Sequence, residues 1–132
     1  MAIRLLLVDD DAGFRGTLRE LLEQRPGVQV LGEAENGEEA IRLAGELRPD
    51  VVLMDLAMPR MNGLEATRHL KARWPNLAVI ILTVHDEEIS RRMAMAAGAA
   101  AFMEKKTLGV RLWPTLATVR GQKLPSPDRE RA

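Results

Sequence analysis

The sequence predicts an α/β fold in which helices cover both faces of a parallel sheet. Four short apolar runs have the length and aliphatic character of buried strands. Each run stops at or shortly before a carboxylate, hydroxyl or ammonium side chain: Leu5–Val8 before Asp9, Val51–Met54 before Asp55, Val79–Leu82 before Thr83, and Phe102–Met103 before Lys105. Helical patterns separate the runs, and a repeated strand-helix order favours right-handed crossovers between parallel strands.

The first half of the chain contains two expected helices and one further strand. After Asp11, apolar residues recur at helical spacing until Pro26 and Gly27 interrupt the pattern: Phe14, Leu18, Leu21 and Leu22. The segment Val28–Leu31 is expected to form a strand, and its weaker aliphatic character favours a place near the edge of the sheet. The helix after it ends before Pro49 and carries one apolar face: Ala40, Ile41, Ala44 and Leu47.

Three helices are expected in the second half. Asn62 and Gly63 begin one of them, which carries Leu64, Thr67 and Leu70. His85 or Asp86 is expected to cap a helix over residues 86–97, whose inner stripe before Gly98 is Ile89, Met93, Ala96 and Ala97. In the final helical stretch, Pro114 would remove a backbone hydrogen bond, so we expect that helix to begin at Pro114 and residues 107–113 to be irregular.

Composition limits the classes of protein to which the chain can belong. Its 132 residues and 46% hydrophobic content suit a single domain with its own core. Nineteen basic residues balance nineteen acidic ones, which argues against a nucleic-acid surface. The chain has no cysteine, which excludes disulfides and thiolate metal sites. No apolar leader or spanning stretch is apparent, so we expect a cytoplasmic location. Residues 1–120 form the expected domain, and residues 121–132, with two prolines and alternating charges, form the expected tail or linker.

Asp9, Asp10 and Asp55 are the candidate metal ligands. A helix start needs only one capping carboxylate, and three adjacent ones repel each other, so a cap alone does not explain Asp9, Asp10 and Asp11. Magnesium prefers such hard oxygen ligands. The carboxyl ends of parallel strands meet at one edge of the sheet, which would bring Asp55 to the same pocket. The spacing of Asp9 and Asp11 also fits a small phosphoaspartyl hydrolase, although a short chain leaves little room for a substrate pocket.

Taken in order, four motifs resemble the receiver domain of two-component response regulators, most closely the subfamily usually joined to a helix-turn-helix domain. They are LLLVDDD, VVLMDLAMPRMNGLEA, VIILT and the AGA…F…EK segment, and together they extend from about Ile3 to Thr107. The resemblance implies a flavodoxin-like fold with strand order 2-1-3-4-5. It also implies a phosphorylation switch rather than an enzyme acting on other substrates, with a sensor histidine kinase or a histidine phosphotransfer protein as phosphoryl donor.

The resemblance also implies a role for each site residue. Asp55 accepts the phosphoryl group, and Mg²⁺ is held by Asp9, Asp10, Asp55 and the backbone carbonyl of Ala57. Thr83 hydrogen-bonds the phosphoryl group and Lys105 pairs with it. Phe102 occupies the position of the aromatic switch residue. Each of these residues taken alone would have an ordinary structural explanation, so the prediction depends on their joint occurrence.

The sequence departs from the family after Lys105, where Lys106 replaces the proline or aspartate found in many receivers. This departure keeps open the alternative of an interaction module that works without phosphorylation. We expect a homodimer through the 86–97 helix, the strand near Phe102 and the final helix. Trp113 is expected in or beside that surface, either as a core residue or as an anchor for a partner. Neither nucleic acid nor a membrane is an expected partner.

Overall fold

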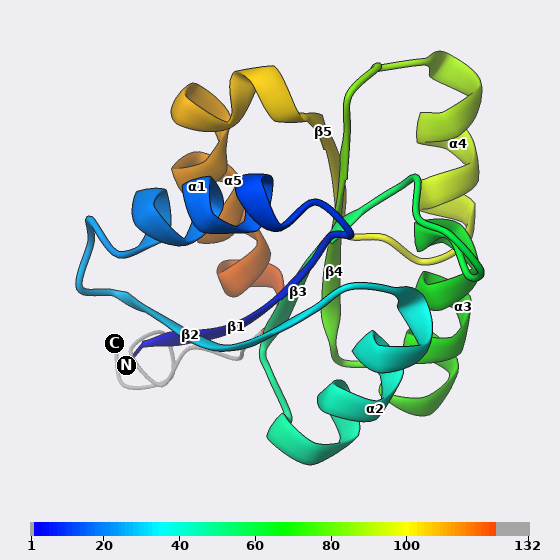
Figure 1. Cartoon of the computed structure of the whole chain (residues 1–132), viewed down its shortest axis with the longest axis horizontal. Helices are drawn as coiled ribbons and strands as arrows, with labels where there is room; N and C mark the ends of the chain where they lie inside the picture. Colours follow the sequence, from blue (N-terminus) through cyan, green and yellow to red (C-terminus); the bar gives the residue numbers. More distant parts are fainter. Residues whose placement is uncertain (1, 124–132) are drawn as a thin grey trace.

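The computed structural model describes residues 2–123 and contains one parallel sheet between two layers of helices (Figure 1). Its strands lie in the order β2-β1-β3-β4-β5, which confirms the predicted fold class and strand order. Their bounds are β1 (Ile3–Val8), β2 (Val28–Ala34), β3 (Val51–Asp55), β4 (Ala78–Thr83) and β5 (Ala101–Glu104). The four buried runs and the weaker edge strand of the sequence are therefore all strands.

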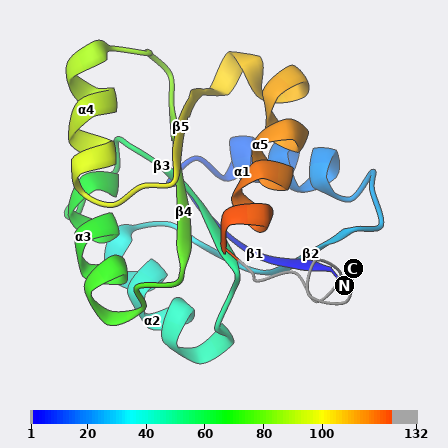
Figure 2. The ribbon, with the colours of Figure 1, turned by 180° about the vertical axis from the view of Figure 1, so that it is seen from behind.

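Five α-helices cover the sheet in the described part of the chain. They are α1 (Ala12–Leu22), α2 (Gly37–Leu47), α3 (Gly63–Arg73), α4 (Glu88–Ala96) and α5 (Leu108–Lys123), and a 3₁₀ turn, Lys105–Thr107, precedes the last. Helices α1 and α5 lie on one face, and α2, α3 and α4 lie on the other (Figure 1 and Figure 2). The described residues include no helix long and apolar enough to cross a membrane.

Successive strand residues point to opposite faces, so the sheet has two separate hydrophobic cores. In β1, Leu5 and Leu7 belong to the core under α1 and α5, whereas Leu6 and Val8 belong to the core under the other helices. All four side chains are buried, with exposed fractions of 2% or less. This burial fixes the register of the sheet, because a slip by one residue would exchange the two faces.

The register of the strands brings the polar strand ends to one edge of the sheet. Val8 pairs with Met54 across β1 and β3, and Thr83 pairs with Glu104 across β4 and β5. The residues that follow β1 and β5, and the last residues of β3 and β4, therefore lie at the same edge. The polar side chains at these strand ends are therefore neighbours at this edge.

The expected late start of the final helix is wrong. Helix α5 begins at Leu108 and contains Pro114 in its interior. One buried face continues across the proline: Leu108, Leu112, Leu116 and Val119. Burying each aliphatic side chain contributes about 1.5–3 kcal/mol, and Leu108 and Leu112 together therefore offset the roughly 3 kcal/mol cost of an interior proline. The helix extends through Lys123, beyond the expected domain boundary at residue 120, and residues 124–132 of the expected linker lie outside the described residues.

The predicted inner stripe of the helix after Thr83 is also wrong. In α4, Ile89 is 63% exposed and Met93 is 44% exposed, while Ala94 is the buried residue. Ala94 belongs to the core on this face of the sheet, so the inner face of α4 is displaced by one residue from the predicted stripe. The capping expectation fails too, since Glu87 stands at the N-cap and its side chain makes no capping hydrogen bond.

Trp113 does not lie on the surface formed with α4. It is half-buried against the core under α1 and α5, and the Arg25 guanidinium lies 4.3 Å from its ring centroid. This packing fits the expectation of a largely structural residue and places the ring on the α1 side of α5.

Candidate functional site: an acidic pocket at the carboxyl edge of the sheet

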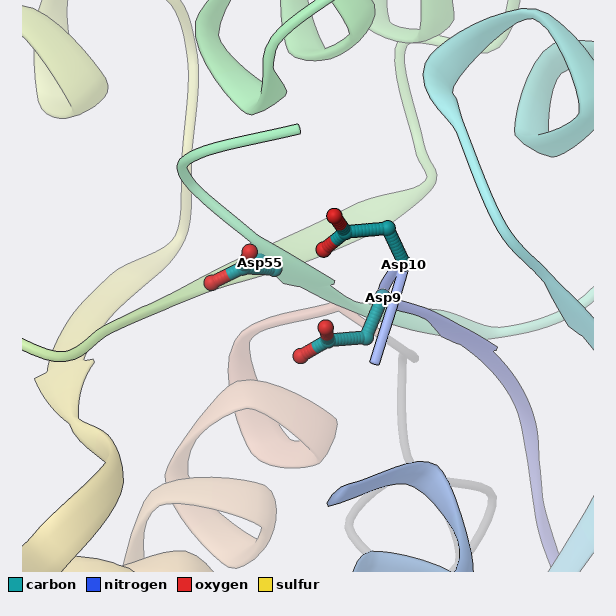
Figure 3. A group of neighbouring side chains, drawn as sticks. All are labelled: Asp9, Asp10 and Asp55. Atoms are coloured by element: carbon teal, nitrogen blue, oxygen red, sulfur yellow. The ribbon is translucent and has the colours of Figure 1, made fainter. Parts of the chain in front are cut away.

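Three carboxylates form the centre of the site. Asp9 and Asp10 follow β1, Asp55 ends β3, and their side chains point to a common side of the sheet edge (Figure 3). One oxygen from each lies within 4.8 Å of the others. Asp9 and Asp55 are buried and Asp10 is exposed, so the group opens to solvent on the Asp10 side.

The third residue of the acidic run has a different task. Asp11 is the N-cap of α1, and its carboxylate accepts a hydrogen bond from the Phe14 N–H at 3.2 Å. The Asp11 N–H in turn donates to Asp9 Oδ1 at 2.9 Å. A single cap therefore serves the helix, and Asp9 and Asp10 remain for the pocket. Because Asp11 caps a helix, the arrangement does not supply the second carboxylate that a phosphoaspartyl hydrolase would need.

Lys105 provides the positive charge of the pocket. Its ammonium donates to Asp9 Oδ2 at 2.7 Å and lies 3.1 Å from Asp55 Oδ1. The Phe14 ring lies beneath it, 4.2 Å from the nitrogen to the ring centroid. Burial lowers the pKa of Lys105, but hydrogen bonds and charge from Asp9 and Asp55 outweigh this effect and raise its pKa above the ordinary value. Lys105 therefore stays charged over the physiological range.

Asp55 has the most perturbed carboxyl group of the site. Burial, together with the negative charge of Asp9, raises its pKa from 3.8 to about 6, and Lys105 offsets only part of this increase. A cation near Asp55 would favour the charged form. The pocket contains two buried carboxylates, one exposed carboxylate and one lysine. It therefore carries excess negative charge and offers the oxygen ligands that a hard divalent cation prefers.

Thr83 lies at the same edge, but its hydroxyl points into the β4–α4 loop. The hydroxyl donates to the His85 carbonyl at 3.0 Å and accepts from the His85 N–H at 3.2 Å. Phe102 is 3% exposed and is packed in the core on the α4 side. Arg91 of α4 covers Phe102, with the guanidinium carbon 4.9 Å from the ring centroid. Phe102 is thus in contact with α4 and Thr83 with the loop that precedes α4. The charged centre of the site consists of Asp9, Asp10, Asp55 and Lys105.

The loop between β3 and α3 forms the opposite wall. Ala57 is exposed and lines a cavity of about 470 Å³ together with Asp10, Met58, Asn62 and neighbouring residues. Helix α3 begins immediately against β3, because Gly63 lies so near that a Cβ atom there would be 2.5 Å from the Asp55 carbonyl oxygen. Sequence reasoning treated Gly63 as an ordinary helix start and missed this contact. The adjacent Asn62-Gly63 pair was the available signal.

Comparison with known proteins gives a consistent result. A model of the response regulator receiver domain family matches residues 5–114. Transcriptional regulatory protein YdfI of Bacillus subtilis (strain 168) is 40% identical over 126 residues, which cover 95% of this chain and 59% of that protein. Response regulator GacA of Pseudomonas aeruginosa is 45% identical over 103 residues, which cover 78% of this chain and 48% of GacA.

A similar structure has also been solved. The crystal structure of a LuxR-family two-component response regulator from Aurantimonas sp. SI85-9A1 matches with a TM-score of 0.87 and 36% identity, over 97% of this chain and 92% of that one. The chain spans about half the length of the two curated relatives, 59% and 48%. The acidic pocket with its lysine, the strand order and these similarities together show that the chain belongs to the response regulator receiver domain family, whose members are phosphorylation-dependent switches.

Proposed function

We propose that Asp55 is the phosphoacceptor and that it takes the phosphoryl group from a phosphohistidine of a sensor histidine kinase or a phosphotransfer protein. The single observation that carries this assignment is the position of Asp55, buried between Asp9 and Lys105 at the carboxyl edge of the sheet. Phosphoryl transfer needs mainly positioning and charge neutralisation. The pocket provides both for this one carboxylate.

In this proposal, Asp9, Asp10, Asp55 and the Ala57 carbonyl hold Mg²⁺, which supplies charge neutralisation for the incoming phosphoryl group. Lys105 adds the second positive charge. It already contacts Asp55 at 3.1 Å and stands where it can pair with a phosphoryl oxygen. The Thr83 hydroxyl gives up its hydrogen bond to the His85 carbonyl and donates to that phosphoryl oxygen instead. Helix α4 and Phe102 change position as Thr83 moves. A hydrogen bond to a charged group is worth roughly 1.5–3 kcal/mol, which is enough to shift a typical two-state equilibrium.

The test is phosphorylation by acetyl phosphate with Mg²⁺, followed by intact-mass measurement. We expect the wild-type chain to gain the mass of one phosphoryl group and Asp55→Asn to gain none, because asparagine is not a nucleophile toward phosphorus. Equal labelling of the two proteins would show that another residue is the acceptor. If neither protein is labelled although both are folded, the chain is an interaction module that works without phosphorylation.

Asp10→Ala separates a metal ligand from a structural role. Among residues 2–123, the Asp10 carboxylate makes no hydrogen bond, and Asp9 and Asp55 lie close to it. Removing it relieves repulsion, so we expect an unchanged or slightly higher unfolding midpoint in metal-free buffer. Magnesium binding and labelling by acetyl phosphate should fall at least about tenfold. A clear fall in the unfolding midpoint in metal-free buffer would mean that Asp10 has a structural role instead.

The proposal extends to the partners and location of the chain. Exposed Ile89 and Met93 on α4 support a homodimer that uses α4, β5 and α5, and light scattering with and without beryllofluoride tests it. If the mass stays that of a monomer in both states, that interface is wrong. We place the protein in the cytoplasm. We propose that the receiver domain extends beyond the expected boundary at residue 120 to the end of α5 at Lys123, and that the residues after it in the expected 121–132 segment lead toward an output domain. The greater length of the curated relatives supports this proposal.

A further inference from the structure

The geometry points to Arg15 as a positioning residue for the metal site, acting through the Asp9–Asp10 peptide. This inference rests on the proposed magnesium site and adds a residue outside the acidic cluster. Arg15 stands in the first half of α1, whose helix begins directly after the acidic run. Its side chain is only 13% exposed, so the guanidinium is held inside the structure and is not a solvated surface charge.

Arg15 bridges the loop after β1 to the neighbouring strand β2. One guanidinium nitrogen, Nη1, donates to the backbone carbonyl oxygen of Asp9 at 2.5 Å. The Nε atom donates to Glu33 Oε1 at 2.7 Å. Glu33 is one residue before the end of β2 and pairs with Leu7 near the end of β1. Because the guanidinium is planar and rigid, these two bonds fix its orientation.

The Asp9 peptide groups are thereby held from both sides. The Asp9 N–H donates to the Ala34 carbonyl at 3.0 Å, and the Asp9 carbonyl accepts from Arg15. That carbonyl belongs to the peptide bond that joins Asp9 to Asp10, and a peptide bond is planar. The plane held by Arg15 therefore fixes the position of the Asp10 Cα atom, from which the carboxylate extends.

Asp10 is the carboxylate whose position depends most on the backbone. The Asp9 carboxylate is already held by the Asp11 N–H and by Lys105. The Asp10 carboxylate is exposed and has no hydrogen bond among the described residues. Partners that orient metal ligands without touching the metal typically contribute a factor of 10–100 in metal affinity.

The charge of Arg15 is offset by carboxylates on the side away from the site, because Glu33 pairs with both Arg15 and Arg19 and Glu23 pairs with Arg19 as well. Glu33 accepts from both Arg15 and Arg19, and these hydrogen bonds hold the pKa of its carboxyl below the ordinary value. Arg19 provides a matched control. It stands on the same helix and donates to Glu33 Oε2 at 2.8 Å, and its hydrogen bonds go to Glu33 and Glu23 rather than to Asp9.

The experiment compares Arg15→Gln with Arg19→Gln in the full chain. Titration of MgCl₂, followed by the amide NMR signals of Asp10 and Asp11, gives the magnesium affinity, and thermal unfolding in a chelator gives the metal-free stability. We expect Arg15→Gln to bind Mg²⁺ about tenfold more weakly and Arg19→Gln to stay within about twofold of wild type. Arg15→Lys cannot make both hydrogen bonds at once, so its magnesium affinity should lie between those of Arg15→Gln and Arg19→Gln.

The labelling rate gives a second readout. With acetyl phosphate, Arg15→Gln should need more Mg²⁺ for half of its maximal rate and should reach nearly the wild-type rate at saturating Mg²⁺, because only the metal site is loosened. Equal affinities for Arg15→Gln and Arg19→Gln would overturn the inference while the proposed site stands. If wild type itself binds no Mg²⁺, the proposed function fails instead. If Arg15→Gln does not fold, the Arg15→Lys result decides: an affinity equal to that of wild type overturns the inference.

Discussion

Asp55→Asn will stabilise the metal-free protein at neutral pH, and the gain will disappear in acid. Folding raises the pKa of Asp55 from 3.8 to about 6, with burial as the main cause and Asp9 as the second. Between about pH 4 and pH 6 the unfolded state has lost the proton while the folded state still holds it, so the stability of the wild type falls across this range. Above about pH 6 the full penalty of the buried charge is present. Below the unfolded pKa, both states hold the proton and the penalty is absent.

The size of the effect follows from the shift. About two pKa units correspond to at most about 3 kcal/mol, so the difference in unfolding free energy between Asp55→Asn and wild type should rise toward that value between about pH 4 and pH 6 and remain constant above it. Urea unfolding in a chelator across this range measures it. Asp11→Asn is the control, because asparagine caps a helix as well as aspartate. A difference for Asp55→Asn that is the same at acid and neutral pH would refute the raised pKa.

Lys105→Met should destabilise the metal-free protein by about 3 kcal/mol at neutral pH. It removes the cation that contacts both Asp9 and Asp55, which are buried, and leaves their charges uncompensated. The deficit should shrink in acid, where Asp55, whose pKa is raised to about 6, takes up a proton. Mg²⁺ should stabilise this variant more than it stabilises wild type, because the metal then replaces the missing charge.

Lys106→Met is the matched control for that experiment. Lys106 is the next residue, but its side chain is 76% exposed and its only ion pair in the described part of the chain, with Glu104, is 3.7 Å long. Exposed pairs of this kind contribute little, so the change should stay within about 0.5 kcal/mol. Equal effects of the two substitutions would mean that Lys105 is not the charge that balances the pocket.

The strands and the charged centre could be predicted because their signals are local and chemical. A buried parallel strand is a continuous apolar run, and the polar residue at its end must lie at the carboxyl edge of the sheet. This reasoning placed Asp9, Asp55 and Lys105 together correctly. It could not predict the orientation of the Thr83 side chain, because a hydroxyl can donate to or accept from several neighbours. In this structure the hydroxyl is hydrogen-bonded to the His85 backbone.

The errors occurred where tertiary packing decides between local alternatives. Pro114 carries a local cost that the burial of Leu108 and Leu112 outweighs. Apolar spacing in α4 predicted Ile89 and Met93 as inner residues, but the helix buries Ala94 in the core instead. Arg15 passed unnoticed because an arginine on a helix ordinarily faces solvent. Its partners, Asp9 and Glu33, lie on strands and loops that sequence periodicity does not bring together.

In the proposed switch, a phosphoryl group on Asp55 moves the Thr83 hydroxyl away from His85. Beryllofluoride with Mg²⁺ stands in for that phosphoryl group, and amide NMR with hydrogen exchange reports on the His85 N–H, which now donates to Thr83 Oγ1 at 3.2 Å. Beryllofluoride should shift the His85 signal and speed exchange of its amide in wild type, with no such change in Asp55→Asn. If fluorine NMR shows beryllofluoride bound to Asp55 while the His85 signal and its exchange stay unchanged, the switch through Thr83 is contradicted.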